Sequence, residues 1–208
     1  MNSRFESMSG RVDVPFPAYE EPPAEPWELA VSWFEEALEG DDVREPRAMS
    51  LATTTAEHDL SARVIAVSGF DPEGVVFSTH RGSRKLSGVL NGVGLFYWKE
   101  LGRQLSVAGP LEVLSDAESD RSWHARPVAL HPMSSVSRQS EELDDAASLR
   151  RRAAALADRG PLPRPGSYCA VRLRPAAVEF WVARPDRVHL RLRYECGTGG
   201  WRSTRLQP

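Results

Sequence analysis

Cationic side chains occupy every second position of one segment near the C-terminus. In RVHLRLRY, residues 187–194, these side chains are Arg187, His189, Arg191 and Arg193. A strand turns alternate side chains to opposite faces, so the segment predicts a strand with all four cations on one face. Neighbours on that face lie about 6.5 Å apart, which allows one row to contact two ligand groups. The net charge of −3 argues against general nucleic-acid binding, and the row therefore predicts a small anion as ligand.

Two more cations, Arg84 and Lys85, follow Ser83 in HRGSRK, residues 80–85. Serine is a favoured N-cap, so a short helix ending near Asn91 is predicted here. Cations in the first turn of a helix interact unfavourably with its dipole. An anion bound at that end would make the electrostatic energy of this arrangement favourable. The motif therefore indicates either an anion site or two side chains that point into solvent.

Arg63 opens the apolar strand RVIAVS, where alternation places it on one face with Ile65 and Val67. An arginine is seldom buried without a partner, so this position indicates a bound anion. An arginine on a solvated strand edge is the alternative.

The stretch HPMSSVSRQSEEL, residues 131–143, is predicted to be a polar loop. Its hydroxyl and amide groups suit a phosphate or a heterocycle, although a plain connection has the same composition. The relevant side chains are Ser134, Ser135, Ser137, Gln139 and Ser140. His58, His124 and His131 have no metal-ligand or catalytic-triad spacing, and no metal site is predicted.

The pattern of elements is mainly β with added helices. A Pro-rich arm is expected over 1–26, followed by one domain over 27–208. Helices are predicted in WELAVSWFEEALEGD, ending at Gly40, and around 116–125 and 144–159. Short turns such as DPEG at 71–74 indicate antiparallel strands in a barrel or sandwich. The predicted strands are 48–54, 62–70, 74–80, 94–99, 104–114, 168–174, 177–183, 187–195 and 201–206.

Composition narrows the cellular context. No apolar run reaches the roughly 20 residues of a membrane helix, and the N-terminus is polar rather than signal-like. The two cysteines, Cys169 and Cys196, form no close-spaced pair. A cytoplasmic protein that contacts neither membrane nor nucleic acid is expected.

Several motifs occur in a characteristic order from about Glu45 to the C-terminus: EPRAM, ARVIAVS, FSTHRGSRK, RQL, ARP, SRQS, EFW, RVHLR and RLQP. In this order the chain resembles the pyridoxine 5′-phosphate oxidase family of FMN-dependent split-barrel proteins. The arm and HPMSSVSRQSE are most similar to the flavin oxidases of phenazine biosynthesis. The resemblance implies an antiparallel FMN-binding split β-barrel of Greek-key type, and a homodimer with FMN at the subunit interface.

The resemblance also implies roles for individual residues. Arg187 and His189 match the family's substrate-side R-L-H pair and are the candidate catalytic residues. The positions that match FMN contacts are Arg63, Val64, Ile65, Ser78, Thr79, Arg84, Lys85, Gln104, Gln139, Ser140, Trp181 and Arg191. Arg193 has no assigned partner and is expected to be solvated or structural.

The substrate side departs from the family pattern. Pyridoxine phosphate oxidases hold the substrate phosphate with a lysine, a tyrosine, an arginine and a serine, and Ser68, Ser122, Arg126 and Leu130 stand at these positions. Each lost charge-assisted hydrogen bond removes about 1.5–3 kcal/mol, so a phosphorylated vitamin is disfavoured. A flat aromatic carboxylate would suit Arg126, Arg187 and His189.

The expected activity is oxidation of reduced phenazine carboxylic acids, with dioxygen as acceptor and hydrogen peroxide as product. His189 would accept a proton or only bind the substrate. Two alternatives stay open: a pyridoxine phosphate oxidase, and an FMN-binding protein without turnover.

Overall fold

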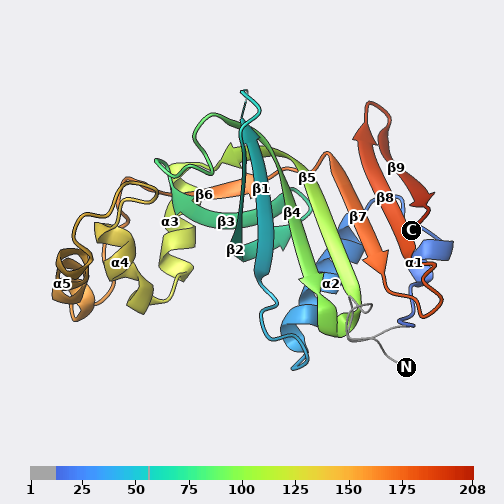
Figure 1. Cartoon of the computed structure of the whole chain (residues 1–208), viewed down its shortest axis with the longest axis horizontal. Helices are drawn as coiled ribbons and strands as arrows, with labels where there is room; N and C mark the ends of the chain where they lie inside the picture. The colour runs from blue at the N-terminus through green and yellow to red at the C-terminus, as the bar shows by residue number, and fades with distance from the viewer. Residues whose placement is uncertain (1–12, 56) are drawn as a thin grey trace.

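Antiparallel strands form one sheet, part of which closes into a barrel (Figure 1). The computed structural model describes residues 13–55 and 57–208. The strand order is β4-β1-β2-β3-β6-β5-β7-β8-β9, and an additional β4–β5 pairing closes the first six strands. The strands are β1 (Ala48–Thr55), β2 (Leu60–Asp71), β3 (Gly74–His80), β4 (Val89–Trp98), β5 (Arg103–Val113), β6 (Tyr168–Leu173), β7 (Ala177–Val182), β8 (Leu190–Gly197) and β9 (Gly200–Leu206). The predicted antiparallel split barrel is confirmed.

Strand β5 belongs both to the barrel and to the extension formed by β7, β8 and β9. Its first part, 103–108, pairs with β7, and its last part, 111–113, pairs with β6. Gly109 lies between the two parts, where a Cβ atom would overlap the carbonyl oxygen of Arg174. The absence of a side chain therefore lets the link between β6 and β7 cross β5 closely.

The hairpin predicted over 62–80 is confirmed. Asp71 pairs with Gly74, and the Asp71 carboxylate accepts hydrogen bonds from the backbone N–H groups of Glu73 and Gly74. Gly74 has a φ of 140°, a backbone conformation that disfavours a side chain. This turn fixes the register of β2, the strand that carries Arg63.

Helices cover the barrel and extend one end of the molecule. They are α1 (Pro17–Glu20), α2 (Trp27–Glu39), η1 (Lys99–Leu101), α3 (Asp116–Ala125), η2 (Val128–Leu130), α4 (His131–Val136) and α5 (Ala146–Ala157). On α2, Trp33 packs edge-on against Phe180 at 5.0 Å and Phe34 against Phe96 at 5.7 Å between ring centres. Figure 1 shows α4 and α5 at the opposite end of the molecule from β8 and β9.

Four sequence predictions need correction. Strand β4 begins at Val89 rather than at residue 94. Residues 81–88 form turns, so Ser83 caps no helix and the predicted short helix is absent from this described segment. The predicted loop 131–143 begins with helix α4, because the turn at His131 continues into an α-helix through Val136. Strand β8 begins at Leu190, and Arg187 has a left-handed φ of 68° that cannot continue a strand.

The described part of the arm, residues 13–26, packs against the body of the molecule. Phe16 is buried, with its ring 5.3 Å from that of Trp33. The buried Tyr194 hydroxyl donates to the carbonyl oxygen of Pro23, and Arg205 donates to the carbonyl oxygen of Tyr19. Within the described residues, no helix is long and apolar enough to cross a membrane.

Candidate functional site

Arg63, Arg84 and Lys85 form a group of neighbouring cations, which we call the cation cluster. Arg63 lies on the inward face of β2, where it donates to the carbonyl oxygen of Leu51 and to Thr53 Oγ1, both at 3.0 Å. Predicted alternation is confirmed here, since Ile65 and Val67 share this face and Val67 is buried. The strand therefore turns a charged group toward the interior of the fold.

Lys85 is held by hydroxyl groups of strand β3 and of its own turn. Its Nζ donates to Ser83 Oγ at 2.7 Å and to Thr79 Oγ1 at 3.0 Å. Thr79 in turn donates to Gln139 Oε1 at 2.9 Å, and the backbone N–H of Arg84 donates to Ser140 Oγ at 3.1 Å. Turn 81–88 and the segment after α4 are thus joined around the ammonium group.

The cation cluster carries charge without acidic partners. Burial, and then the charge of Arg63, lowers the pKa of Lys85. Burial and then the charge of Arg84 lower the pKa of Arg63. None of the ion pairs formed by the described residues includes these three side chains, so the arrangement fits an anion such as a phosphate.

A chain of hydroxyl groups lies beside the cation cluster. Ser122 on α3 shares a hydrogen bond of 2.8 Å with Ser78 on β3 and one of 3.2 Å with the Tyr168 hydroxyl. The Arg126 guanidinium lies 6.0 Å from the centre of the Tyr168 ring, and its Nε is buried without a partner among the described residues. Burial, and then the charges of Lys85 and Arg126, lowers the pKa of the adjacent His80.

The remaining substrate-side positions predicted from sequence are placed differently. Ser68 donates to the carbonyl oxygen of Val76 at 2.9 Å on the exposed side of β2. Leu130 ends η2 with 46% of its surface exposed. Arg126 is thus the ionic group that these positions contribute.

A second set of predicted residues lies on the outer face of β5, β7 and β8. Gln104, Trp181 and Arg191 are direct neighbours across the three strands. They line a pocket of about 240 Å³, which we call the outer-face pocket. Its lining is completed by Leu95, Ser106, Glu179 and Pro208.

Arg191 and Arg193 do lie on one face, and both bind Glu179. Arg191 approaches Glu179 at 2.7 Å and Arg193 at 3.4 Å. Arg193 also pairs with Glu195 at 3.0 Å, which agrees with the structural role expected for it. The predicted four-cation row is therefore limited to these two arginines within the strand.

Arg187 and His189 precede β8 in a compact turn. The backbone N–H of Arg187 donates to the carbonyl oxygen of Arg184 at 3.2 Å, and the backbone N–H of Val188 donates to Asp186 Oδ1 at 3.0 Å. His189 stands 4.8 Å from Trp181 between ring centres. The turn therefore places the imidazole beside the outer-face pocket.

The backbone N–H of Arg184 donates to Nδ1 of His189 at 3.1 Å. Since a backbone N–H can only donate, Nδ1 carries a lone pair. In the neutral imidazole the hydrogen is then on Nε2.

In the described residues of one chain, no hydrogen bond or ion pair joins the cation cluster to the outer-face pocket. Val64 instead points outward from β2, with 67% of its surface exposed. The predicted site residues thus form two groups.

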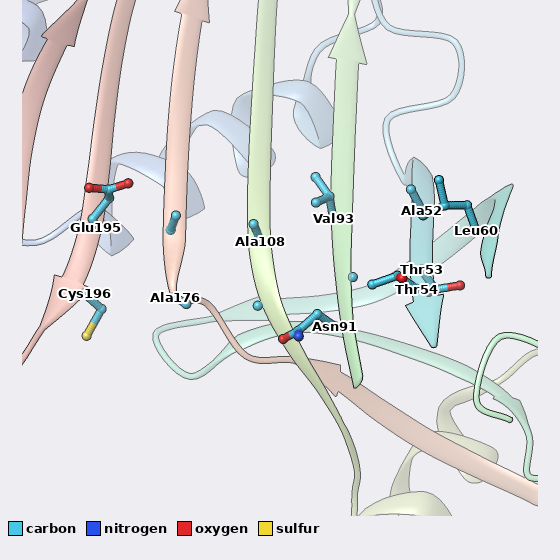
Figure 2. A pocket seen from close by; sticks show the side chains of 13 residues that line it. Ala52, Thr53, Thr54, Leu60, Asn91, Val93, Ala108, Ala176, Glu195 and Cys196 are labelled. Carbon is cyan, nitrogen blue, oxygen red and sulfur yellow. The ribbon is translucent and has the colours of Figure 1, made fainter. Parts of the chain in front are cut away.

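An apolar groove of about 590 Å³ crosses the outer face (Figure 2). Its lining includes one row of directly paired residues on five strands, and three of these residues are alanines. From β1 to β8 this row is Ala52, Val93, Ala108, Ala177 and Glu195. Two residues further along the strands the same face carries Leu95, Ser106 and Glu179, which line the outer-face pocket.

Glu179 and Tyr168 are polar contacts that sequence reasoning missed. Alternation within EFW puts Glu179 on the same face as Trp181, which was a usable signal. No local pattern marks Tyr168, because it joins Ser122 only through tertiary structure. Among residues 13–55 and 57–208, no cluster of His, Cys, Asp and Glu side chains could hold a metal ion.

The comparisons with known proteins identify the family. The model of the pyridoxamine 5′-phosphate oxidase family matches residues 35–160, and that of the pyridoxine 5′-phosphate oxidase C-terminal dimerisation region matches residues 168–208. The chain belongs to the pyridoxamine 5′-phosphate oxidase family, and is thus a flavin-dependent oxidoreductase. The dimerisation region supports a homodimer, and it contains Glu179, Trp181, His189 and Arg191.

Individual relatives resemble the chain over nearly its whole length. It is 47% identical to the dihydrophenazinedicarboxylate synthase of Burkholderia lata, over 99% of both chains. It is 44% identical to that of Pseudomonas chlororaphis, over 98% of this chain and 93% of the relative. The pyridoxine/pyridoxamine 5′-phosphate oxidase of Rubrobacter xylanophilus is 42% identical, over 85% of this chain and 83% of the relative.

A solved structure has the same fold throughout. The crystal structure of PhzG from Burkholderia lata, in complex with tetrahydrophenazine-1-carboxylic acid, has a TM-score of 0.92 and 45% identity. The match covers 96% of this chain and 100% of that one.

Proposed function

We propose that the chain is a homodimeric FMN-dependent oxidase that dehydrogenates reduced phenazine carboxylic acids in phenazine biosynthesis. Dioxygen is the electron acceptor and hydrogen peroxide the second product. The relatives named dihydrophenazinedicarboxylate synthase support this substrate class, because their similarity extends over almost the whole chain.

The cation cluster fits the phosphate group of FMN. Arg63, Arg84 and Lys85 repel one another and have no acidic partner among the described residues. A phosphate dianion would supply the missing negative charge, and the Ser140 hydroxyl lies close enough to join its ligands. The cluster therefore favours FMN over a flavin that lacks a phosphate.

The dimer offers a way to unite the two groups of site residues. We place the cation cluster of one subunit and the outer-face pocket of the other around the same flavin, with the backbone of Val64 and Ile65 beside its ring. Trp181 supplies an apolar surface there, and Gln104 and Arg191 supply hydrogen-bond donors. When bound, FMN would supply the redox chemistry, which is acceptance of a hydride equivalent from the substrate and transfer of two electrons to dioxygen.

The observation that carries the choice of substrate is that the hydroxyl of Ser122 is already bonded to Ser78 and Tyr168. Ser68 is likewise bonded to a main-chain carbonyl, so two positions of the family's phosphate clamp are engaged elsewhere. Arg126 alone carries one positive charge, which balances a carboxylate but not a phosphate dianion. A flat tricyclic carboxylate would also gain contact with Trp181.

His189 has the geometry of a substrate-binding donor. Its Nδ1 accepts from the backbone N–H of Arg184, and Nε2–H, which has no hydrogen-bond partner among residues 13–55 and 57–208, can donate to a carboxylate. Taking up a further proton would require Nδ1 to give up that hydrogen bond. Of the two roles left open by the sequence, binding is therefore favoured over proton acceptance, and Arg187, two residues earlier in the same turn, would supply the positive charge.

Anaerobic mixing of the FMN-loaded protein with tetrahydrophenazine-1-carboxylic acid tests the proposal. Bleaching of the oxidised-flavin absorbance by this acid, and not by pyridoxine 5′-phosphate, is expected. The variant Arg126→Met should bleach more slowly at low substrate concentration with its FMN retained. Bleaching by pyridoxine 5′-phosphate alone would instead establish a vitamin oxidase and refute the proposal.

A further inference from the structure

The N-terminal arm is connected to His189 through one residue. Asp13 binds Arg184 through an ion pair of 2.5 Å, and its backbone N–H donates to the carbonyl oxygen of Ala183 at 3.4 Å. The backbone N–H of that same Arg184 donates to His189 Nδ1. Two groups of one residue thus join the arm to the imidazole.

The backbone around this connection is conformationally restricted. Asp13 has a φ of 66° and Arg187 a φ of 68°, both in the left-handed region that few residues other than glycine adopt. Such conformations persist where surrounding contacts hold them, and they concentrate at functional sites. Both residues contact Arg184: Asp13 binds its side chain, and the backbone N–H of Arg187 donates to its carbonyl oxygen.

We propose that Asp13 and Arg184 are positioning residues that hold His189 in the tautomer with hydrogen on Nε2, and thereby couple the arm to substrate binding. The identity of the substrate rests on the proposed function, whereas the positioning does not. With the ion pair in place, the Arg184 N–H stays directed at Nδ1 and the ring presents Nε2–H to the carboxylate. Without it, residues 183–189 can relax and the imidazole can exchange between tautomers.

The competing explanation is that the ion pair between Asp13 and Arg184 only attaches the arm to the body of the molecule and does not position His189. The arm has a second attachment, in which Arg205 donates to the carbonyl oxygens of Tyr19 and Glu20. None of these three residues, Arg205 of β9 and Tyr19 and Glu20 of α1, is hydrogen-bonded to His189 among the described residues. Arg205→Met therefore loosens the arm without touching the connection to His189, and it serves as the matched control.

The experiment compares the FMN-loaded variants Asp13→Asn, Arg184→Met, Arg184→Lys and Arg205→Met with the unmodified protein. Asparagine also tolerates a left-handed backbone, so Asp13→Asn removes charge without adding strain. The ¹⁵N chemical shifts of the imidazoles report the tautomer, and His189→Gln assigns the signals. Steady-state oxidation of tetrahydrophenazine-1-carboxylic acid separates KM from kcat.

In the unmodified protein and in Arg205→Met, His189 should show an unprotonated Nδ1 and a protonated Nε2. Asp13→Asn and Arg184→Met should average these two shifts and raise KM by about two- to tenfold, the effect of one hydrogen bond, with kcat nearly unchanged. Arg184→Lys retains the positive charge that binds Asp13. Its His189 shifts and its KM should therefore be close to those of the unmodified protein.

Unchanged His189 shifts in Asp13→Asn and Arg184→Met would overturn the proposal, as would changed shifts with an unchanged KM. An equal effect of Arg205→Met would also overturn it, because loosening the arm would then be sufficient. If the unmodified protein fails to oxidise the phenazine acid, the proposed function fails, and the ¹⁵N shifts still decide whether Asp13 and Arg184 position His189.

Discussion

Glu179 on β7 binds Arg191 on β8 at 2.7 Å, across neighbouring strands of the outer face. The carboxylate is mostly buried, with 17% of the side chain exposed, and its other oxygen faces Arg193. An arginine held in this way loses less rotamer freedom when a ligand arrives. Glu179 therefore prepares Arg191 for binding at the edge of the outer-face pocket.

Replacing Glu179 with glutamine should weaken FMN binding by about tenfold, within the range of one charge-assisted hydrogen bond. Without the carboxylate, Arg191 and Arg193 repel each other and Arg191 is no longer fixed. Quenching of FMN fluorescence on titration measures the affinity. Glu112→Gln removes the acidic partner of Arg174, outside the outer-face pocket and the apolar groove, and should leave the affinity unchanged; equal losses in the two variants would contradict this role of Glu179.

The cation cluster predicts a sharp contrast between two neighbouring positively charged residues. Lys85→Met should weaken FMN binding by about 10- to 100-fold, because it removes a charge-assisted contact to phosphate. Arg81→Met is the control, since Arg81 pairs with Asp116 outside the cluster. The same fluorescence titration, repeated with riboflavin, should show a much smaller effect of Lys85→Met for the ligand without phosphate. An equal loss for riboflavin would argue against the phosphate assignment.

Lys85 also predicts how the stability of the FMN-free protein depends on pH. Burial lowers the pKa of Lys85 in the folded state below its usual value near 10.5. Between these two pKa values the unfolded chain binds more protons than the folded one, so stability should rise with pH in this window. The melting temperature of Lys85→Met should lack this contribution, and below the window the variant should melt at a higher temperature than the unmodified protein. Parallel pH profiles for the two would refute the prediction.

Much of the fold follows from local sequence patterns. Alternation placed Arg63 with Ile65 and Val67, and DPEG fixed the hairpin, because both depend on residues close in sequence. The start of β8 was wrong, since RVHLR alternates perfectly and nothing local reveals the left-handed backbone of Arg187. There, the hydrogen bonds from Arg187 N–H to the Arg184 carbonyl and from Arg184 N–H to His189 hold residues 184–189 in a turn, although their sequence alternates like a strand.

The candidate site was predicted less completely than the fold. The sequence predicted which residues belong to the site. It did not predict that they form two separate groups, because the cation cluster and the outer-face pocket lie on different strands of one chain. Glu179 stands in the motif EFW, but its ion pairs with Arg191 and Arg193 depend on the pairing of β7 with β8, which the local sequence does not reveal. Connections such as Asp13 to Arg184 join residues 171 positions apart and leave no local signal.

The apolar groove predicts where the second subunit binds. It adjoins the outer-face pocket, which begins two residues further along β4, β5 and β7, and part of its lining belongs to the dimerisation region. Val93→Glu would bury a carboxylate in this interface, at a cost of several kcal/mol, and should raise the dimer dissociation constant by at least about 100-fold. Because we assign the flavin site to both subunits, FMN should be lost together with the dimer.

Sedimentation velocity with detection of flavin absorbance measures dimer and cofactor in one experiment. Val113→Glu is the matched control, because Val113 has nearly the same exposed fraction as Val93, 41% against 42%, and lies on β5 outside the groove. This control should sediment as a dimer with FMN. A dimeric Val93→Glu would show that the subunits associate through another face, and a monomer that retains FMN at full affinity would show that one chain suffices to build the site.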